Sequence, residues 1–353
     1  MKLWEKNIRK VEPYVPGEQP NIPGMIKLNT NENPYPPAPG VLNAMKEFQV
    51  DKLKLYPDPT AKILVDELAN YYHLNPNQVF VGVGSDDVLA MAFMTFFNSD
   101  KPILFPDITY SFYDVWAELF KIPYIRPALD ENFKMKPEDY YKENGGIVIA
   151  NPNAPTSSYE DLDFIRNILS HNQESIVIVD EAYIDFGGRS AIELIPEFDN
   201  LLVVQTFSKS RSMAGMRIGY ALGNEALIKV INDVKYSYNS YTMNQTSLMF
   251  GVEAVKDERY FNECINKIIN TRERVIIEMR KLGFSMPQSK TNFIFATHKD
   301  IPAQKLFTGL KENKIYVRYF NKPRIDNYLR ITIGTDYEMD TLLRVLKDLV
   351  KSE

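Results

Sequence analysis

Short apolar runs alternate with helix-like patterns between residues 61 and 222 of this 353-residue chain. Leu64, Leu68 and Tyr72 recur at helical spacing, and a run of β-branched and aromatic residues follows them. The predicted strands are Val79–Val83, Ile103–Phe105, Ile147–Ala150, Ile176–Val179, Leu201–Gln205 and Ile218–Leu222. Near-continuous apolar strands separated by helices are typical of an α/β fold with a mostly parallel sheet that is covered on both faces.

The pattern changes after residue 245. One long amphipathic helix is predicted from Phe261 to Leu282, and Gly283 stands where a helix is expected to end. Three strand-like runs follow, at Phe293–Ala296, Ile315–Tyr319 and Leu329–Ile333. A last helix begins at the capping-box pattern Thr335–Glu338. We interpret this part as a second, smaller α/β domain.

The first forty residues are rich in Pro and Asn, which disfavours both helices and central strands. We expect an extended N-terminal arm over residues 1–40. It is expected to be ordered rather than floppy, because Tyr14, Ile26, Leu28 and Tyr35 provide apolar anchors. The predicted division is therefore an arm at 1–40, a large domain at 41–247 and a small C-terminal domain at 248–353.

The composition of the chain argues against several classes of function. The net charge of −5 gives no general electrostatic reason to bind nucleic acid or an anionic membrane. The longest apolar run, Val88–Phe97, is about half as long as a membrane-spanning helix, and the charged amino terminus is unlike a signal peptide. Cys264 is the single cysteine and only three histidines occur, so we expect no disulfide and no metal site. We expect a metal-free cytoplasmic enzyme or binding protein.

Candidate chemistry lies after two of the buried strands. Asp180 and Tyr183 follow one strand, and the hydroxyl-rich loop after the next contains Ser208, Lys209 and Arg217. Each residue alone has an ordinary structural explanation, such as a turn cap or a solvated charge. Together they match the needs of pyridoxal 5′-phosphate. Lys209 supplies an amine for the imine, Asp180 pairs with the ring nitrogen, Tyr183 donates to the phenolic oxygen, and Ser208 and Arg217 hold the phosphate.

A second candidate phosphate element is the turn Gly84-Ser85-Asp86, which leads from a strand into an apolar helix. Free backbone N–H groups at a helix amino end attract anions. The alternative is simply a well-capped helix with Ser85 as the cap. Because Lys209 and Arg217 are also present, we favour a phosphate site.

Several motifs resemble the signatures of the fold-type-I, pyridoxal-phosphate-dependent aminotransferases. These are Asp180–Tyr183, Ser208-Lys209, Ala214–Arg217 and Leu329–Thr335. Two further motifs, Leu28–Pro34 and Tyr56–Pro59, are similar to those of the histidinol-phosphate aminotransferase family. The resemblance extends from about Tyr14 to Leu349, and it implies a large cofactor-binding domain, a smaller C-terminal α/β domain and an N-terminal arm.

The resemblance implies further site residues. Tyr110 resembles the aromatic residue that stacks on the cofactor, although a plain core tyrosine is the alternative. Tyr56 resembles a phenol that reaches the cofactor phosphate of the other subunit, which implies a homodimer with shared active sites. Arg330 resembles the arginine that binds the substrate anion, and Tyr14, Asn31 and Arg318 complete the implied substrate pocket. Arg318 could equally be the solvent-facing residue of an alternating strand.

One motif departs from the family pattern. The family usually reads Asn-Asn-Pro-Thr-Gly where this chain has Asn153-Ala154-Pro155-Thr156-Ser157. The asparagine expected to donate to the phenolic oxygen of the cofactor is thus Ala154. Either Tyr183 acts there alone, or Asn153 reaches the same oxygen through a shifted backbone.

The resemblance implies reversible amino transfer between histidinol phosphate and 2-oxoglutarate, which yields imidazole-acetol phosphate and glutamate. Lys209 would shuttle the proton and Asp180 would stabilise the electron sink. An aromatic amino acid aminotransferase and, less expected, a threonine-phosphate decarboxylase share this scaffold and remain alternatives. A non-catalytic cofactor-binding regulator would need a helix-turn-helix segment and a basic face, and the sequence predicts neither.

Overall fold

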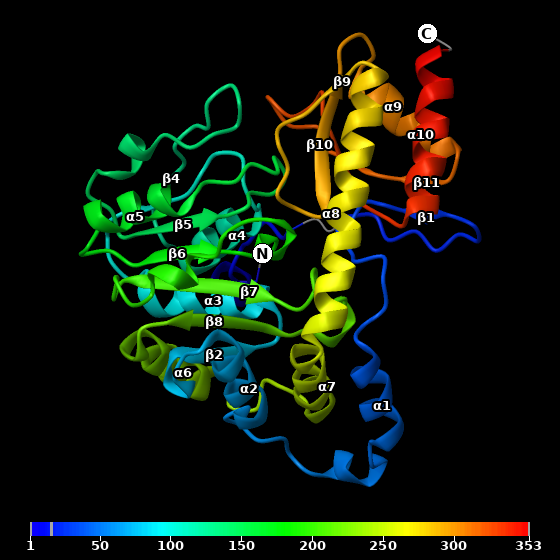
Figure 1. Ribbon diagram of the computed structural model, residues 1–353. Helices are drawn as coiled ribbons and strands as arrows, with labels where there is room; N and C mark the ends of the chain where they lie inside the picture. Colours follow the sequence, from blue (N-terminus) through cyan, green and yellow to red (C-terminus); the bar gives the residue numbers. More distant parts are fainter. Residues whose placement is uncertain (1, 15–16, 352–353) are drawn as a thin grey trace.

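The apolar strand runs assemble into one seven-stranded sheet, in the order β2-β8-β7-β6-β5-β3-β4 (Figure 1). The strands are β2 (Val79–Gly82), β3 (Ile103–Leu104), β4 (Tyr124–Ile125), β5 (Gly146–Ala150), β6 (Val177–Asp180), β7 (Leu201–Thr206) and β8 (Gly219–Gly223). All neighbours pair in parallel except β8, which is antiparallel to both β2 and β7. The predicted mostly parallel α/β sheet is confirmed, although the short β4 was missed.

The computed structural model describes residues 2–14 and 17–351. Residues 1 and 15–16 of the predicted arm, and residues 352–353 of the predicted small domain, lie outside the described residues. In the described part, no helix combines the length and the apolar character needed to cross a membrane. The same part contains no group of three or more His, Cys, Asp or Glu side chains that could hold a metal ion.

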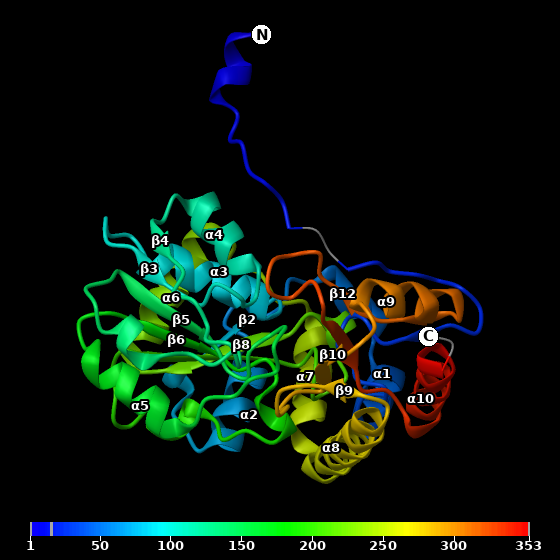
Figure 2. The ribbon, with the colours of Figure 1, turned by 90° about the horizontal axis from the view of Figure 1, so that it is seen from above.

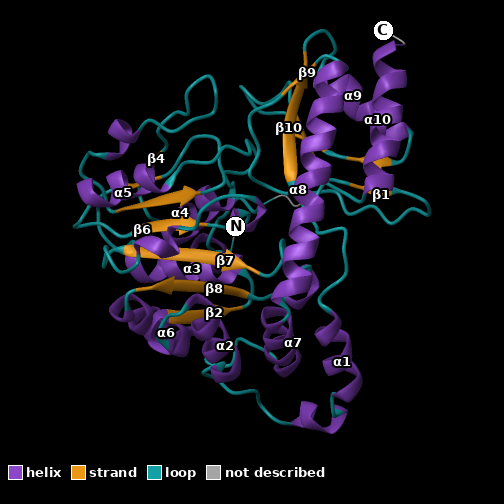
Figure 3. Ribbon diagram, in the orientation of Figure 1, coloured by secondary structure: helices purple, strands orange, loops and turns teal. Residues whose placement is uncertain are grey.

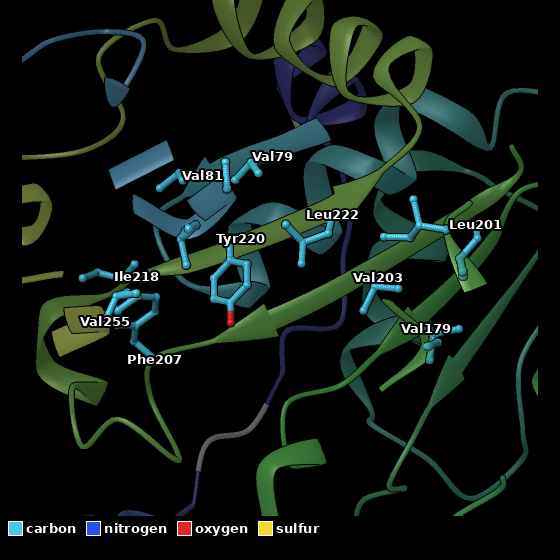
Figure 4. Packing of buried hydrophobic residues seen from close by; sticks show 14 of the residues in the cluster. Val79, Val81, Val179, Leu201, Val203, Phe207, Ile218, Tyr220, Leu222 and Val255 are labelled. Atoms are coloured by element: carbon cyan, nitrogen blue, oxygen red, sulfur yellow. The ribbon is translucent and has the colours of Figure 1, made fainter. Parts of the chain in front are cut away.

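Helices cover both faces of the sheet. They are α1 (Pro39–Glu47), α2 (Lys62–Tyr72), α3 (Ser85–Phe96), α4 (Phe112–Phe120), α5 (Leu162–His171), α6 (Glu225–Tyr238) and α7 (Gln245–Lys256). Because strand side chains alternate, Val177 and Val179 of β6 enter one core with α2, α5 and α7. Ile178 enters the opposite core with α3, α4 and α6. Figure 4 shows side chains of the first core, contributed by β2, β6, β7 and β8.

The chain after α7 forms the second, smaller layer of strands and helices. Its elements are α8 (Glu258–Lys281), β9 (Phe284–Ser285), β10 (Phe293–His298), α9 (Ala303–Glu312), β11 (Ile315–Tyr316), β12 (Arg318–Tyr319), β13 (Leu329–Thr332) and α10 (Asp336–Lys351). Four of the strands form an antiparallel sheet in the order β12-β13-β10-β9. Figure 3 shows β9 and β10 of this sheet beside α8. Helix α8 stops as predicted, with Gly283 at φ 92°.

The run expected as one strand at Ile315–Tyr319 is two strands. β11 pairs in parallel with β1 (Ile26–Lys27) from the N-terminal segment, whereas β12 pairs with β13. Val317 separates them and packs into the core of the smaller layer. The prediction of one strand was wrong because Ile315 and Tyr316 pair with β1, a strand from near the other end of the chain. The local sequence pattern contains no signal for this long-range pairing.

The capping box predicted before the last helix is present. The backbone N–H of Thr335 donates to Glu338 Oε2 at 2.7 Å, and the N–H of Glu338 donates to Thr335 Oγ1 at 3.4 Å. Short 3₁₀ turns fill several connections, namely η1 (Leu3–Asn7), η2 (Val50–Lys54), η3 (Pro76–Gln78), η4 (Pro137–Tyr140), η5 (Ile184–Phe186), η6 (Ala191–Leu194) and η7 (Ala214–Met216).

The N-terminal segment has two parts. Figure 2 shows its beginning projecting away from the rest of the molecule, where Trp4 and other apolar side chains are exposed. Further along, Leu28 is buried in the core of the smaller layer, and Tyr35 packs against that core. The boundary predicted after residue 247 falls within α7, which packs against α1 and α2. The division into an arm and two domains therefore stays a prediction.

Candidate active site

Two adjoining cavities lie at the carboxyl ends of β5, β6 and β7. The inner one has a volume of about 190 Å³ and the outer one about 600 Å³. Both are lined by Tyr110, Ala154, Tyr183 and Lys209, so they are parts of one cleft. The inner part adds Ser85, Asp86, Asp180, Ser208 and Arg217. The outer part adds Tyr14, Asn31, Arg318 and Arg330. The cleft thus contains most of the predicted site residues.

Asp180 is the last residue of β6, and its side chain lines the inner cavity. The hydroxyl of Tyr113, from α4, donates to Asp180 Oδ2 at 2.7 Å, and the N–H of Ala182 donates to Oδ1 at 3.3 Å. Burial raises the pKa of Asp180 to about 6, although both hydrogen bonds act to lower it. A cationic partner beside Asp180 would favour the ionised form of its carboxylate. The protonated ring nitrogen of a pyridine is one such partner.

Lys209 follows β7 and lies between the two parts of the cleft. Its Nζ donates to the backbone oxygen of Thr30 at 3.3 Å and lies 5.7 Å from the centre of the Tyr183 ring. Asn33 fixes the lysine's backbone, because its Nδ2 donates to the carbonyl oxygens of Lys209 and Ser210, each at 3.1 Å. In the described part of the chain, no carboxylate forms an ion pair with the amine, which is therefore available to a ligand.

The hydroxyl of Tyr183 lies beside the amide of Asn31. Asn31 Nδ2 donates to Tyr183 Oη at 2.9 Å, and the other amide atom, Oδ1, accepts a hydrogen bond from Thr332 Oγ1 at 3.1 Å. Asn31 thereby links an N-terminal segment, a loop after β6 and strand β13. It also adopts a left-handed backbone with φ 56°, a conformation that asparagine tolerates better than most residues.

The turn before α3 meets Arg217 at the inner cavity. Gly84 has φ 85°, and a Cβ there would lie only 2.6 Å from Arg217 Nη2, so a larger residue would displace the guanidinium. Asp86 accepts hydrogen bonds from Tyr110 Oη at 2.8 Å and from Arg217 Nη2 at 3.3 Å. The alternative role of Ser85 as the helix cap is wrong: Gly84 is the N-cap, and Ser85 is the first helical residue.

Arg318 and Arg330 face the outer cavity from β12 and β13. Arg330 Nη2 donates to the carbonyl oxygen of Asn29 at 2.9 Å, whereas its buried Nε has no hydrogen-bond partner among the described residues. Burial lowers the pKa of Arg330, and the charge of Arg318 lowers it further. Both guanidinium groups lie over the ring of Phe320, at 5.5 and 5.6 Å. Two neighbouring cations without a carboxylate partner in the described chain form a site for an anion.

Two predicted cofactor residues lie outside both cavities. The side-chain amide of Asn153 is hydrogen-bonded to the loop between β3 and α4. Its Nδ2 donates to the carbonyl oxygen of Ile108 at 2.9 Å, and its Oδ1 accepts from Thr109 Oγ1 at 2.7 Å. Ala154, not Asn153, lines the cleft. Tyr56 is 81% exposed, and its ring lies tilted against that of Tyr241, with ring centres 4.7 Å apart.

Sequence reasoning missed three residues that hold the site together. Tyr113 supports Asp180, Asn33 supports Lys209, and Phe320 lies under both arginines. Tyr113 stands three residues after Tyr110 at the start of a helix, a spacing that suited a core aromatic equally well. Asn33 belongs to the Leu28–Pro34 motif, which was the one available signal.

Comparisons with known proteins agree with this geometry. Residues 23–346 match the aminotransferase class I and II family. The chain belongs to this family. A histidinol-phosphate aminotransferase of Clostridium beijerinckii is 50% identical to it over 351 residues, which cover 99% of this chain and 98% of the relative.

Solved structures give the same fold. The histidinol-phosphate aminotransferase of Clostridium acetobutylicum has a TM-score of 0.85 at 24% identity, covering 93% of this chain and all of that chain. The enzyme of Sinorhizobium meliloti, in complex with pyridoxal 5′-phosphate, has a TM-score of 0.85 at 22% identity, covering 93% and 91% of the two chains. The aminotransferase fold and the transaminase class predicted from the sequence are confirmed.

Aminotransferases of this family depend on pyridoxal phosphate, and the inner cavity has a suitable set of groups. An amine, a buried carboxylate, a phenol and an arginine beside a helix amino end surround one space. The first N–H groups of α3 lack acceptors within their own helix and can bind a phosphate. Asp86 competes for Arg217, so a phosphate would have to draw the guanidinium away from that carboxylate.

The buried carboxylate of Asp180 leads to a pH-dependent stability prediction. Its pKa is raised in the folded chain, so the neutral acid is favoured, and Asp180 destabilises the protein increasingly as the pH rises from about 4 to above 6. We expect Asp180→Asn to raise the Tm of the cofactor-free protein by about 2–4 °C at pH 8 and by almost nothing at pH 4.5. Calorimetry at both pH values measures this. The control Asp100→Asn, at an exposed position, should shift Tm little at either pH. An equal shift at both pH values for Asp180→Asn would contradict the assignment.

Proposed function

We propose that the protein transfers an amino group between histidinol phosphate and 2-oxoglutarate, with pyridoxal 5′-phosphate as its cofactor. The observation that supports this most is the placement of Arg318 and Arg330 across one cleft from Lys209, in a chain half identical to relatives named for this activity. Histidinol phosphate carries an amine and a dianionic phosphate but no α-carboxylate. Two adjacent arginines suit its phosphate, and one of them can hold a carboxylate of glutamate in the other half-reaction.

In the proposed cofactor site, Lys209 and Asp180 have the main roles. When bound, the cofactor withdraws electrons from the substrate carbon that bears the amino group. Asp180 lies where its carboxylate can keep a ring nitrogen protonated, and Tyr113 holds the carboxylate in that orientation. With the cofactor bound, the amine of Lys209 would act as the base that takes the proton from the substrate carbon and delivers it to C4′ of the cofactor. Tyr183, supported by Asn31, donates to the phenolic oxygen. The segment with Thr30 and Asn31 lines one side of the cleft.

The phosphate of the cofactor would bind at the amino end of α3. We assign it Gly84, Ser85 and Asp86 through their backbone, together with Ser208 and Arg217. Tyr110 would stack on the ring, since it lines both parts of the cleft and Asp86 fixes its hydroxyl. The direct role predicted for Asn153 is not supported by its side-chain contacts, because its amide is hydrogen-bonded to Ile108 and Thr109 of the loop between β3 and α4. The cytoplasmic location stays a prediction.

Tyr56 fits this function only in a dimer. Its exposed hydroxyl lies outside the cleft of its own chain, and exposed apolar side chains surround it in sequence, including Val50, Leu53 and Leu55. Burying such a surface against a second copy is favourable. We therefore propose a homodimer in which Tyr56 completes the phosphate site of the other subunit.

The first test concerns the reactive amine. Borohydride treatment of the cofactor-loaded protein should leave a pyridoxyl label on Lys209, and Lys209→Ala should lose both the label and about 10²–10⁴-fold in kcat. Peptide mass spectrometry locates the label. Lys290→Ala, a half-buried lysine outside the cleft, should keep both properties. A label on another lysine in the wild-type protein would refute the role of Lys209.

The dimer is tested by subunit mixing. Tyr56→Ala and Lys209→Ala proteins, each nearly inactive, should regain activity when their subunits exchange, because one hybrid site then contains both intact residues. Asp180→Asn mixed with Lys209→Ala is the control: both residues come from one chain, so no hybrid site is intact. A fully active monomer, seen by light scattering at assay concentration, would rule out the shared site.

Substrate choice is tested at the two arginines. Each charge-assisted contact is worth about 1.5–3 kcal/mol, so removing one arginine should cost at least about tenfold in kcat/KM. Arg330→Ala should impair both half-reactions. Arg318→Ala should impair histidinol phosphate more than phenylalanine, which has no phosphate. If the wild-type protein itself prefers phenylalanine or tyrosine by kcat/KM, the aromatic aminotransferase alternative replaces this proposal.

A further inference from the structure

Arg324, in the loop that joins β12 to β13, hydrogen-bonds to the main sheet region. Arg324 Nη1 donates to Asp107 Oδ2 at 2.7 Å. Its Nη2 donates to the carbonyl oxygens of Leu129 and Asp130, at 2.7 and 2.9 Å. Arg324 is six residues from Arg318 on one side and six from Arg330 on the other. In the sequence, Arg324 therefore lies midway between Arg318 and Arg330, the two arginines of the outer cavity.

The other end of this contact is equally close to the site. Asp107 lies three residues before Tyr110, and its second oxygen accepts from the N–H of Leu129 at 2.9 Å. The next two residues, Ile108 and Thr109, are hydrogen-bonded to the amide of Asn153. The segment that carries Tyr110 is thus fixed along its length, and Arg324 connects it to the loop of the substrate arginines.

An apolar cluster lies under the ion pair. We call the buried residues Ile108, Leu129, Phe133, Phe295 and Ile325 the clasp cluster. It joins the two layers, because its members come from both sides of the cleft. Phe320 packs against this cluster and lies under both guanidinium groups. A displacement of the loop would therefore move Phe320 and, with it, the arginines.

The backbone of Arg324 gives an independent indication. Its φ is 69°, in the left-handed region that a residue with a Cβ adopts at a cost. Such a conformation persists where the surroundings hold it, and the three hydrogen bonds of the guanidinium do so here. The loop is thus held in one particular arrangement by contacts made across the cleft.

We propose that Arg324 and Asp107 are positioning residues for the anionic substrate. Their ion pair, seated on the clasp cluster, sets the distance of Arg318 and Arg330 from Tyr110 and Lys209. An anion held by both arginines is then bound with its amine at the depth of Lys209, and arginines that are displaced from this arrangement bind the anion more weakly. This inference rests on the proposed function, because it assumes that the two arginines bind the substrate anion.

The test compares matched ion-pair variants. Arg324→Ala should raise the KM for histidinol phosphate about tenfold, change kcat less than threefold, and leave the dissociation constant of pyridoxal phosphate unchanged. Arg324→Lys should recover part of the loss, since it keeps the charge opposite Asp107 but not the fork to both carbonyls. The control is Arg274→Ala, which removes an arginine of similar exposure together with its ion pairs to Asp336 and Asp340 in the smaller layer, and it should change none of these constants.

Asp107→Asn provides a second route, because the amide oxygen can still accept from the N–H of Leu129 while the charge is lost. Combined with Arg324→Ala, it should add little to the KM effect of that variant, as expected for two partners in one contact. Hydrogen exchange should become faster in residues 318–330 of both single variants. Asp107→Asn keeps the test decisive if Arg324→Ala does not fold.

The outcomes separate the two proposals. If both folded variants keep the KM of the wild-type protein, or if residues 318–330 exchange no faster, the positioning role is wrong. A general loss of cofactor affinity would also overturn it and indicate only structural support. If the wild-type protein does not accept histidinol phosphate, the proposed function fails instead. The same tenfold criterion is then applied with the anionic amine that the protein does accept.

Discussion

A carboxylate buried at the end of a central strand is the interaction on which the rest of the site depends. Asp180 lies on β6, between two parallel neighbours, where the sheet leaves no room to move it. Burial makes its charge costly, and Tyr113 and the Ala182 N–H offset only part of that cost. The position is therefore poor for stability and good for catalysis, because a buried carboxylate pairs strongly with a cationic ring. Ionisable groups whose burial lowers stability but supports catalysis are common at functional sites.

The N-terminal segment at residues 28–33 links this carboxylate region to the substrate arginines. Its carbonyl groups accept hydrogen bonds from two cations of the cleft: Asn29 from Arg330 and Thr30 from Lys209. Asn31 bonds to Tyr183 on one side and to Thr332 on the other. One short segment thus contacts the main sheet region and the smaller layer in consecutive residues. This explains why a stretch rich in Asn and Pro is ordered although it forms little regular structure.

The sequence predicts the parts of this molecule that depend on local pattern. Six of the seven strands of the main sheet, the long helix ending at Gly283 and the capping box at Thr335 were predicted because their signals lie within a few residues. Contacts between distant segments could not be found in this way. The division of Ile315–Tyr319 depends on pairing with Ile26–Lys27, almost three hundred residues earlier. The site residues were predicted from motif order, whereas Tyr113 and Phe320 carry no motif and act only through their position in space.

The strand end that supplies the chemistry also anchors the opposite face of the sheet. Glu181 follows Asp180 directly, so its side chain points away from the cleft. There its Oε2 accepts from Ser190 Oγ at 2.5 Å and from Gln205 Nε2 at 2.8 Å, and burial raises its pKa to about 8. Gln205 in turn accepts from Tyr220 Oη at 2.7 Å. These bonds tie the end of β6 to β7 and β8 from behind. The two neighbouring carboxylates thus have different roles. Asp180 faces the proposed ligand, and Glu181 helps to hold the strand end that carries Asp180.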